Sequence, residues 1–203
     1  MTKQQANWSS YDFNGGTCVA IAGAGYCVIA VDTRMFTGYN ILTRDNSKIC
    51  KLADKSILAS SGFQADVQAL QKVLSARHLY LSSSDIITIP KQVSCPTMAQ
   101  LLSNTLYYKR FFPYYAFNVL GGLENKNRLQ CQGSGSTLIM PFLDDQLKSP
   151  SPLLLPAQFS NNLLVKTAFA STTERDICTG DKLKIVELNA HGVCGEYEEL
   201  RKD

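Results

Sequence analysis

Residues 17–34 constrain the fold more than any other part of the chain. They read TCVAIAGAGYCVIAVDTR, two short runs rich in valine, isoleucine and alanine that are separated by Gly23, Ala24 and Gly25. β-Branched side chains favour strands, and glycine permits the tight turn that joins two of them. The pattern predicts a hairpin of buried strands, so the fold begins with a sheet.

The later segments alternate between strand and helix patterns. Short apolar runs bounded by turn residues indicate strands, and apolar residues at three-to-four spacing indicate helices. The pattern predicts strands within 41–52 and at 56–61, helices at 65–78 and 98–107, a strand at 115–120, helices at 136–147 and 163–170, and a closing hairpin of 183–188 and 195–200. This order suits two sheets packed between two helical layers.

The size of the chain favours one domain. It has 203 residues, 45% of them hydrophobic, which is enough for a single sizeable core. Residues 1–15 are polar and end at the pair Gly15 and Gly16, which marks them as an extension outside the fold. We therefore expect an N-terminal extension at 1–15 that resembles a propeptide, followed by one domain at 16–203.

Composition argues against several function classes. The net charge of +3 comes from 20 basic and 17 acidic residues without a long run of either sign, which disfavours nucleic-acid binding. Seven scattered cysteines without a CxxC pair indicate neither a disulfide framework nor a zinc site, and they favour a reducing cytoplasmic or nuclear setting. With only His78 and His191, no multi-histidine metal centre is expected. We expect no cofactor and, since no stretch reaches about 18 apolar residues, no membrane span.

Six short motifs in a fixed order carry a family resemblance that runs from about Tyr11 to Asp203. They are GGT at 15–17, VDTR at 31–34, SGFQAD at 61–66, KRFFPYY at 109–115, GSGS at 133–136 and ERDICTGD at 174–181. Together they resemble the proteasome beta family. With the closing ELRKD at 199–203, the last motifs most resemble its type-1 group, which occupies the sixth beta position.

The resemblance implies an α+β fold of the N-terminal-nucleophile hydrolase type, a four-layer αββα sandwich of two antiparallel sheets between helix layers. The chain departs from the family at two places, since its segments at 122–131 and 158–163 are shorter than usual. The first usually holds a strand hairpin. Its loss from a sheet edge would expose apolar surface and unpaired backbone groups.

The resemblance also implies the site residues. Active members use an N-terminal threonine as nucleophile, and here that position holds Gly16, sixteen residues before Asp32, which lies sixteen before Lys48. Glycine has no side-chain oxygen, so it forms no acyl-enzyme. The other matching positions are the aspartate Asp32, the lysine Lys48, the oxyanion glycine Gly62, the supporting serine Ser134, the distal aspartate Asp176, and Thr179 where active members carry a serine.

Thr17 offers an active alternative, because cleavage between Gly16 and Thr17 would expose its amine. Neighbouring strand residues face opposite sides of a sheet, so Thr17 is expected to face away from Lys48. Without a nucleophile, Asp32 and Lys48 are expected to act as a buried ion pair that holds two strands together.

The remaining motif residues have structural interpretations. Gly62, Gly133 and Gly135 are typical of tight turns, and GSGS lacks the lysine that would follow in a phosphate loop. The aromatic residues at 111–115 are interpreted mainly as core, with a share at a subunit interface as the alternative.

The implied function is structural. By resemblance, the chain is a non-catalytic subunit of the 20S proteasome core, an obligate hetero-oligomer of 28 subunits in the cytoplasm and nucleus that degrades ubiquitinated and other proteins. Its partners would be beta subunits of its own ring, alpha-ring subunits and the opposite beta ring, with no nucleic acid or membrane. The rivals are an active threonine endopeptidase that begins at Thr17 and a free-standing amidohydrolase-like relative.

Overall fold

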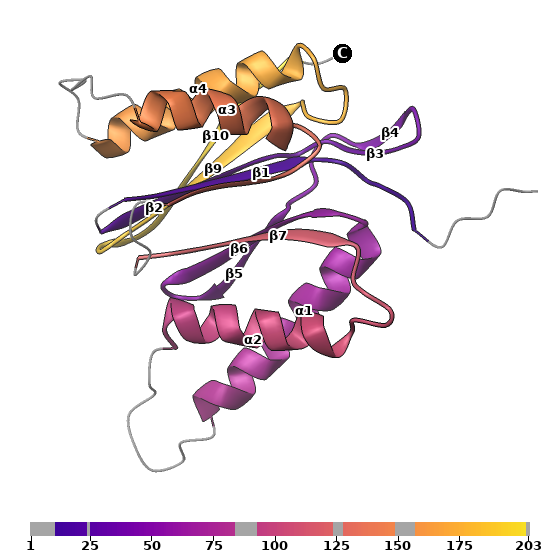
Figure 1. Cartoon of the computed structure of the whole chain (residues 1–203), viewed down its shortest axis with the longest axis vertical. Helices are drawn as coiled ribbons and strands as arrows, with labels where there is room; N and C mark the ends of the chain where they lie inside the picture. The colour runs from indigo at the N-terminus through magenta and orange to yellow at the C-terminus, as the bar shows by residue number, and fades with distance from the viewer. Residues whose placement is uncertain (1–10, 24, 84–92, 124–127, 149–156, 202–203) are drawn as a thin grey trace, which may run out of the picture.

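The computed structural model describes residues 11–23, 25–83, 93–123, 128–148 and 157–201. Its elements lie in layers: two helices, a five-stranded sheet, a three-stranded sheet and two further helices (Figure 1). Both sheets are antiparallel. The mixed fold with antiparallel sheets that the sequence predicts is confirmed.

The five-stranded sheet contains the hairpin that opens the sequence. Its strand order is β10-β9-β2-β1-β8. The strands are β1 (Thr17–Gly23), β2 (Tyr26–Asp32), β8 (Arg128–Gly133), β9 (Lys182–Asn189) and β10 (Gly192–Glu199). β1 and β2 are almost entirely buried, which explains why both are continuous apolar runs rather than alternating ones. The two predicted hairpins are therefore confirmed.

The smaller sheet has the order β5-β6-β7, and a short hairpin lies apart from it. The strands are β5 (Ile49–Ala53), β6 (Ser56–Gly62) and β7 (Ala116–Gly122), with β3 (Met35–Thr37) and β4 (Asn40–Thr43) in the hairpin. The strand-like run at 41–52 is thus divided between two sheets. The residues between β4 and β5 include the charged Arg44 and Asp45, which interrupt the apolar pattern of a buried strand.

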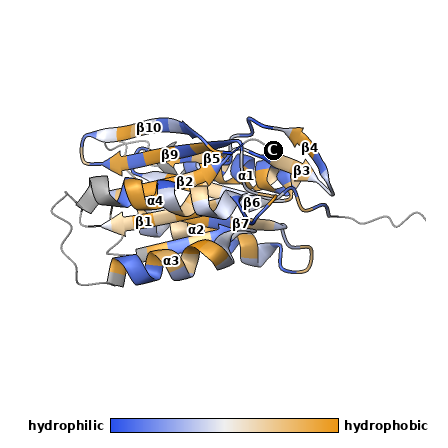
Figure 2. Ribbon diagram, turned by 90° about the horizontal axis from the view of Figure 1, so that it is seen from above, coloured by the Kyte–Doolittle hydropathy of each residue, from blue (hydrophilic) through white to orange (hydrophobic). Residues whose placement is uncertain are grey.

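The four helices cover the outer faces of the two sheets. α3 (Ser136–Lys148) and α4 (Ala157–Thr173) lie on the larger sheet, and α1 (Gln64–Ser83) and α2 (Cys95–Tyr108) lie on the smaller one (Figure 1). α3 carries hydrophilic and hydrophobic residues together (Figure 2), as expected for a helix with one face on a core. α4 begins at Ala157, six residues before the predicted start at Leu163. The last two residues of the loop predicted at 149–158 are therefore helical. Residues 149–156 lie outside the described residues.

Three apolar clusters fill the spaces between the layers. Phe169 and Leu143 join α4 and α3 to the larger sheet, Ile29 and Ile57 meet between the sheets, and Leu70 of α1 is buried against the smaller sheet. Every layer is therefore held to the next by buried apolar area, the main stabilising term in folding. No helix among the described residues has both the length and the apolar character needed to cross a membrane.

Residues 11–15 pack onto the domain. The Phe13 ring lies edge to face with those of Phe36, Tyr115 and Phe117, at centroid distances of 6.1 to 6.4 Å. Asn14 is 6% exposed. Residues 1–10 lie outside the described residues, so the domain division at Gly16 stays a prediction. The described part of the extension nevertheless contacts the fold directly.

Candidate functional site

Gly16 lies immediately before β1 and faces Lys48. Its φ of +92° is in the left-handed region, which glycine adopts without strain. A Cβ atom on residue 16 would collide with the Nζ of Lys48, with the lysine Cε at 2.5 Å. The ammonium group thus lies where a side chain of residue 16 would begin. Position 16 therefore faces Lys48 and offers no hydroxyl.

Lys48 and Asp32 form a buried ion pair. Lys48 Nζ lies 2.8 Å from Asp32 Oδ1 and donates a second bond of 2.7 Å to the carbonyl oxygen of Arg34. Asp32 Oδ1 also accepts a bond of 2.7 Å from the backbone N–H of Thr17. Both side chains are at most 3% exposed. Burial raises the pKa of Asp32, while the charge and hydrogen bond of Lys48 oppose that rise.

Thr17 faces the opposite side of the strand. Its Oγ1 lies 2.8 Å from Thr179 Oγ1 and accepts a bond of 2.9 Å from the N–H of Gly135. Its backbone N–H, in contrast, points to Asp32. The side chains of residues 16 and 17 would therefore point to different environments, as strand alternation requires. The Thr17 hydroxyl does not approach Lys48.

A hydroxyl network extends from Thr17 to Asp176. Thr179 Oγ1 donates to Asp176 Oδ2 at 2.7 Å, and Ser134 Oγ donates to the same oxygen at 2.7 Å. Because the Thr179 proton goes to the carboxylate, Thr17 must donate its own proton to Thr179. The N–H of Ser134 also donates to the Gly16 carbonyl oxygen at 3.2 Å. The structure thus brings Ser134, Asp176 and Thr179 together beside residues 16 and 17.

Gly62 approaches the residue that precedes position 16. Its φ is +113°, and its N–H points to the Gly15 carbonyl oxygen at 3.5 Å, which is long for a hydrogen bond. A Cβ atom there would lie 2.6 Å from the carbonyl oxygen of Tyr115, so a side chain at residue 62 would strain the backbone. The predicted oxyanion glycine therefore directs an N–H toward the carbonyl group that precedes residue 16.

Two features of the site were missed by the sequence analysis. Arg34 is buried and pairs through Nε with Asp181 Oδ2 at 3.0 Å, and Arg44 contacts the other oxygen of this carboxylate. The side chain of Asn14 bonds to three partners on β3 and α1. Arg34 and Asp181 belong to the VDTR and CTGD motifs, but a pair 147 residues apart has no local sequence signal.

The aromatic segment at 111–115 is divided between core and surface. Tyr114 packs against the apolar cluster between the smaller sheet and α1 and α2, whereas Phe111 and Phe112 are 80% and 81% exposed. Tyr115 is itself exposed, although its ring contacts those of Phe13 and Phe117. Arg110 stacks on the Phe111 ring at 4.6 Å. The core interpretation is therefore wrong for Phe111 and Phe112.

In the part of the chain that the structure describes, no three histidine, cysteine, aspartate or glutamate side chains are grouped so that they could hold a metal ion. In the GSGS motif, the Gly135 position is closely packed, since a Cβ atom there would lie 2.6 Å from Thr172 Cγ2 and 2.8 Å from Thr17 Oγ1. This supports a tight turn. Burial raises the pKa of the Cys18 thiol, which lies next to Thr17 in β1, to about 12, so this thiol stays protonated at neutral pH.

Comparison with known proteins assigns the family. The family model described as "Proteasome subunit" matches residues 12–188. Proteasome subunit beta type-1 of Petunia hybrida is 65% identical over 227 aligned positions, and that of Arabidopsis thaliana is 63% identical over 227, with full coverage of each chain. The protein of that name from Oryza sativa subsp. japonica is 59% identical over 217 positions, with 95% of this chain and 96% of that protein covered.

The chain therefore belongs to the proteasome subunit family, and these three relatives within it are all beta type-1 subunits. The resemblance to the beta type-1 group is confirmed. The alignments with the Petunia and Arabidopsis proteins extend over 227 positions, 24 more than the 203 residues of this chain. Those relatives thus carry residues without a counterpart here.

Proposed function

We propose that this chain is a non-catalytic, structural subunit of the 20S proteasome core. The observation that carries the proposal is Gly16, which directs no side chain toward Lys48 while the lysine Nζ fills the space that a side chain would need. A threonine-type peptidase requires a hydroxyl at this point, with a base and an oxyanion donor around it. Lys48 and Gly62 are present beside position 16, but glycine stands where the nucleophile would be.

In this proposal the site residues are structural. Asp32 and Lys48 join the end of β2, the backbone of Arg34 and the start of β1 through three buried hydrogen bonds. Asp176 accepts hydrogen bonds from the hydroxyl groups of Ser134 and Thr179 and so ties the turn before α3 to the loop before β9. Such buried networks are costly to break, which gives a reason to retain them without catalysis.

The proposed role is to complete the beta ring and to shape the chamber in which neighbouring subunits degrade ubiquitinated and other proteins. We infer contacts with other beta subunits of the same ring, with alpha-ring subunits and with the opposite beta ring, in a particle of 28 subunits located in the cytoplasm and nucleus. Every subunit of a heterologous ring needs two different contact surfaces. The exposed Phe111 and Phe112 suit such a surface.

The active alternative requires cleavage between Gly16 and Thr17 and a reorientation of Thr17. Its hydroxyl is buried and occupied by Gly135 and Thr179, on the side away from Lys48. The free-standing amidohydrolase-like alternative differs in size, because a chain of 22.4 kDa is readily distinguished from a large particle.

Mass spectrometry of purified particles tests the proposal. The particles are treated with an epoxyketone that reacts only with N-terminal threonine, and the intact mass of this chain is measured before and after. We expect the chain to retain residues ahead of Thr17 and to gain no adduct, while catalytic neighbours in the same particles gain one and serve as the positive control. A chain that begins at Thr17 and carries the adduct would overturn the proposal.

A further inference from the structure

β7 is an edge strand without the usual protection against pairing. It has the sequence AFNVLGG, with no charge, no proline and no register shift against β6. The opposite edge strand, β5, carries Lys51 and a register shift, and β10 at the edge of the other sheet carries Glu196, Glu198 and Glu199. Charges and irregularities are the devices that prevent edge strands from pairing with other chains. Among the described residues, no strand pairs with the outer edge of β7.

The backbone groups of that edge can be assigned from the ladder. Phe63 donates its N–H to the Tyr115 carbonyl oxygen at 2.8 Å, just beyond the pairing of β6 and β7. Because residues of an antiparallel strand alternate in the side to which they bond, Val119 bonds toward β6. Asn118 and Leu120 therefore direct their N–H and C=O groups toward the open edge.

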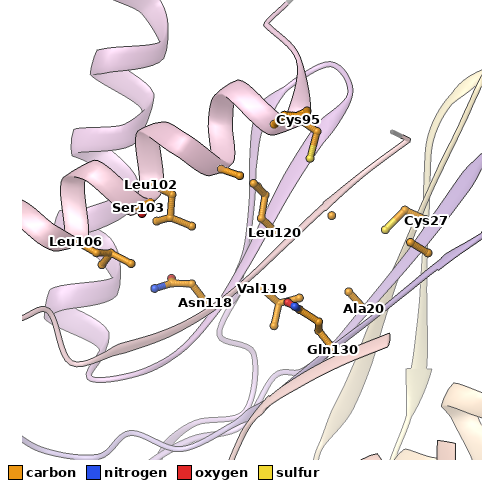
Figure 3. A pocket seen from close by; sticks show the side chains of 14 residues that line it. Ala20, Cys27, Cys95, Leu102, Ser103, Leu106, Asn118, Val119, Leu120 and Gln130 are labelled. Carbon is orange, nitrogen blue, oxygen red and sulfur yellow. The ribbon is translucent and has the colours of Figure 1, made fainter. Parts of the chain in front are cut away.

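A cavity of about 390 Å³ lies along this edge. It is bounded by β7, by α2, and by β1 and β2 of the larger sheet, with Leu120 and Val119 on one side and Ala20 and Cys27 on the other (Figure 3). None of the residues that line it is charged. Its size is within the range of pockets that bind small ligands.

Both faces of an added strand would be covered. Val119 belongs to the apolar cluster between the sheets, and Leu120 packs against the cluster under α1 and α2. A strand placed beside β7 would extend both clusters at once. A strand buried on two faces is a continuous uncharged run, since burial of an unpaired charge is costly.

We propose that the open edge of β7 and its cavity bind an extended, uncharged segment of a partner polypeptide as an added strand. Backbone groups of Asn118 and Leu120 would pair with the segment, and the cavity would receive its apolar side chains. This is strand addition, in which the backbone supplies affinity and the pocket selects side chains.

The geometry favours a foreign segment over a second copy of this chain. Two copies that pair edge to edge would bring one hollow surface against the same hollow surface and leave both cavities unfilled. A segment with protruding side chains fills the space instead.

Fluorescence anisotropy with the full-length chain tests the proposal. The probe is a labelled peptide of seven alternating valine and threonine residues with one lysine at each end. We expect saturable binding, and at least about tenfold weaker binding when two alternate residues of the peptide are proline, which cannot donate to a ladder. Absence of saturable binding, or equal binding of the two peptides, would refute the proposal.

Variants on α2 locate the binding site. Ala99 and Ser103 line the cavity from exposed positions, so Ala99→Glu and Ser103→Glu add charge to it without disturbing the core. We expect each to weaken binding by about tenfold or more, whereas Asn104→Glu, an exposed neighbour outside the cavity, leaves it unchanged. Circular dichroism verifies folding of all three. If the variants and the control bind alike, or if sedimentation shows a dimer that Ala99→Glu dissociates, the proposal is wrong.

Discussion

Position 16 combines a left-handed backbone with a lysine that occupies the space of a side chain. The backbone of Gly16 accepts a bond from Ser134, and Lys48 fills the adjacent space with its Nζ held by Asp32 and the Arg34 carbonyl group. A side chain at this point would meet both a left-handed backbone and the end of the lysine. The site therefore has no space for a side chain at residue 16, and the cost of adding one can be measured.

We predict that Gly16→Ala destabilises the protein more than Gly25→Ala does. Both residues have a positive φ, of +92° and +81°, but only residue 16 has atoms in the path of a Cβ. The backbone strain costs about 1–3 kcal/mol in each variant. At residue 16, Lys48 must also move and weaken its bond to Asp32, so a further loss of about 1 kcal/mol is expected. Urea unfolding measures the free energy of unfolding of the two variants. Equal losses of stability would contradict the prediction, because they would show that Lys48 moves aside without weakening its contacts.

At the scale of elements, the short segment before β1 joins β3 to the start of α1 through the side chain of Asn14. The Asn14 amide donates to the Phe36 carbonyl oxygen at 3.1 Å and to Thr37 Oγ1 at 3.0 Å, both on β3. Its Oδ1 accepts a bond of 2.8 Å from the N–H of Gln64, the first residue of α1. Residue 14 thus satisfies one of the unpaired donors at a helix N-terminus from 50 positions away.

We predict that Asn14→Ala loosens this segment. The variant leaves the Gln64 N–H and the Phe36 carbonyl group without their partner, which costs about 1–3 kcal/mol. Chymotrypsin should then cleave after Phe13 faster than in the unchanged chain, as measured by mass spectrometry of the fragments. Asn14→Asp keeps the acceptor for Gln64 and loses the two donors, so its effect is expected to be smaller. Equal cleavage in all three proteins would exclude the proposed anchoring.

The elements also show where sequence patterns are sufficient. The hairpin of β1 and β2 was predictable because continuous apolar runs and a glycine turn leave few other structures. β8 was missed, because RLQCQG is short, half polar and close to a turn, and only its pairing with β1 makes it a strand. Helix starts were predicted three to six residues late for α2 and α4, because their first turns lack the apolar spacing of the later ones.

The contacts of the site were predictable only in part. The equal spacing of Gly16, Asp32 and Lys48, read through the family resemblance, predicted the contact between Asp32 and Lys48 that the structure contains. The bonds of Asn14 and the pair of Arg34 with Asp181 depend on segments that meet only in the folded chain. No local pattern predicts such contacts.

At the scale of the whole molecule, the buried ion pair connects the fold to assembly. Asp32 is the last residue of β2 in the larger sheet, and Lys48 immediately precedes β5 in the smaller sheet. The start of β1 is joined to the pair by the N–H of Thr17. If the chain is structural, loss of this pair should reduce the amount of particle rather than the chemistry of the particles that form.

We predict that Asp32→Ala lowers particle yield and leaves the peptidase activity of each assembled particle unchanged. Removal of one partner of a buried pair costs about 3–5 kcal/mol, because the remaining charge is buried without compensation. Asp32→Ala combined with Lys48→Met removes both charges and should recover part of the loss. The matched control is Asp54→Ala, which breaks the exposed pair with Lys51 and should assemble normally, since exposed pairs contribute little. Gradient sedimentation and fluorogenic peptides provide the two measurements. Normal assembly of Asp32→Ala with a selective loss of one peptidase activity would instead assign Asp32 to catalysis, and the structural role would have to be abandoned.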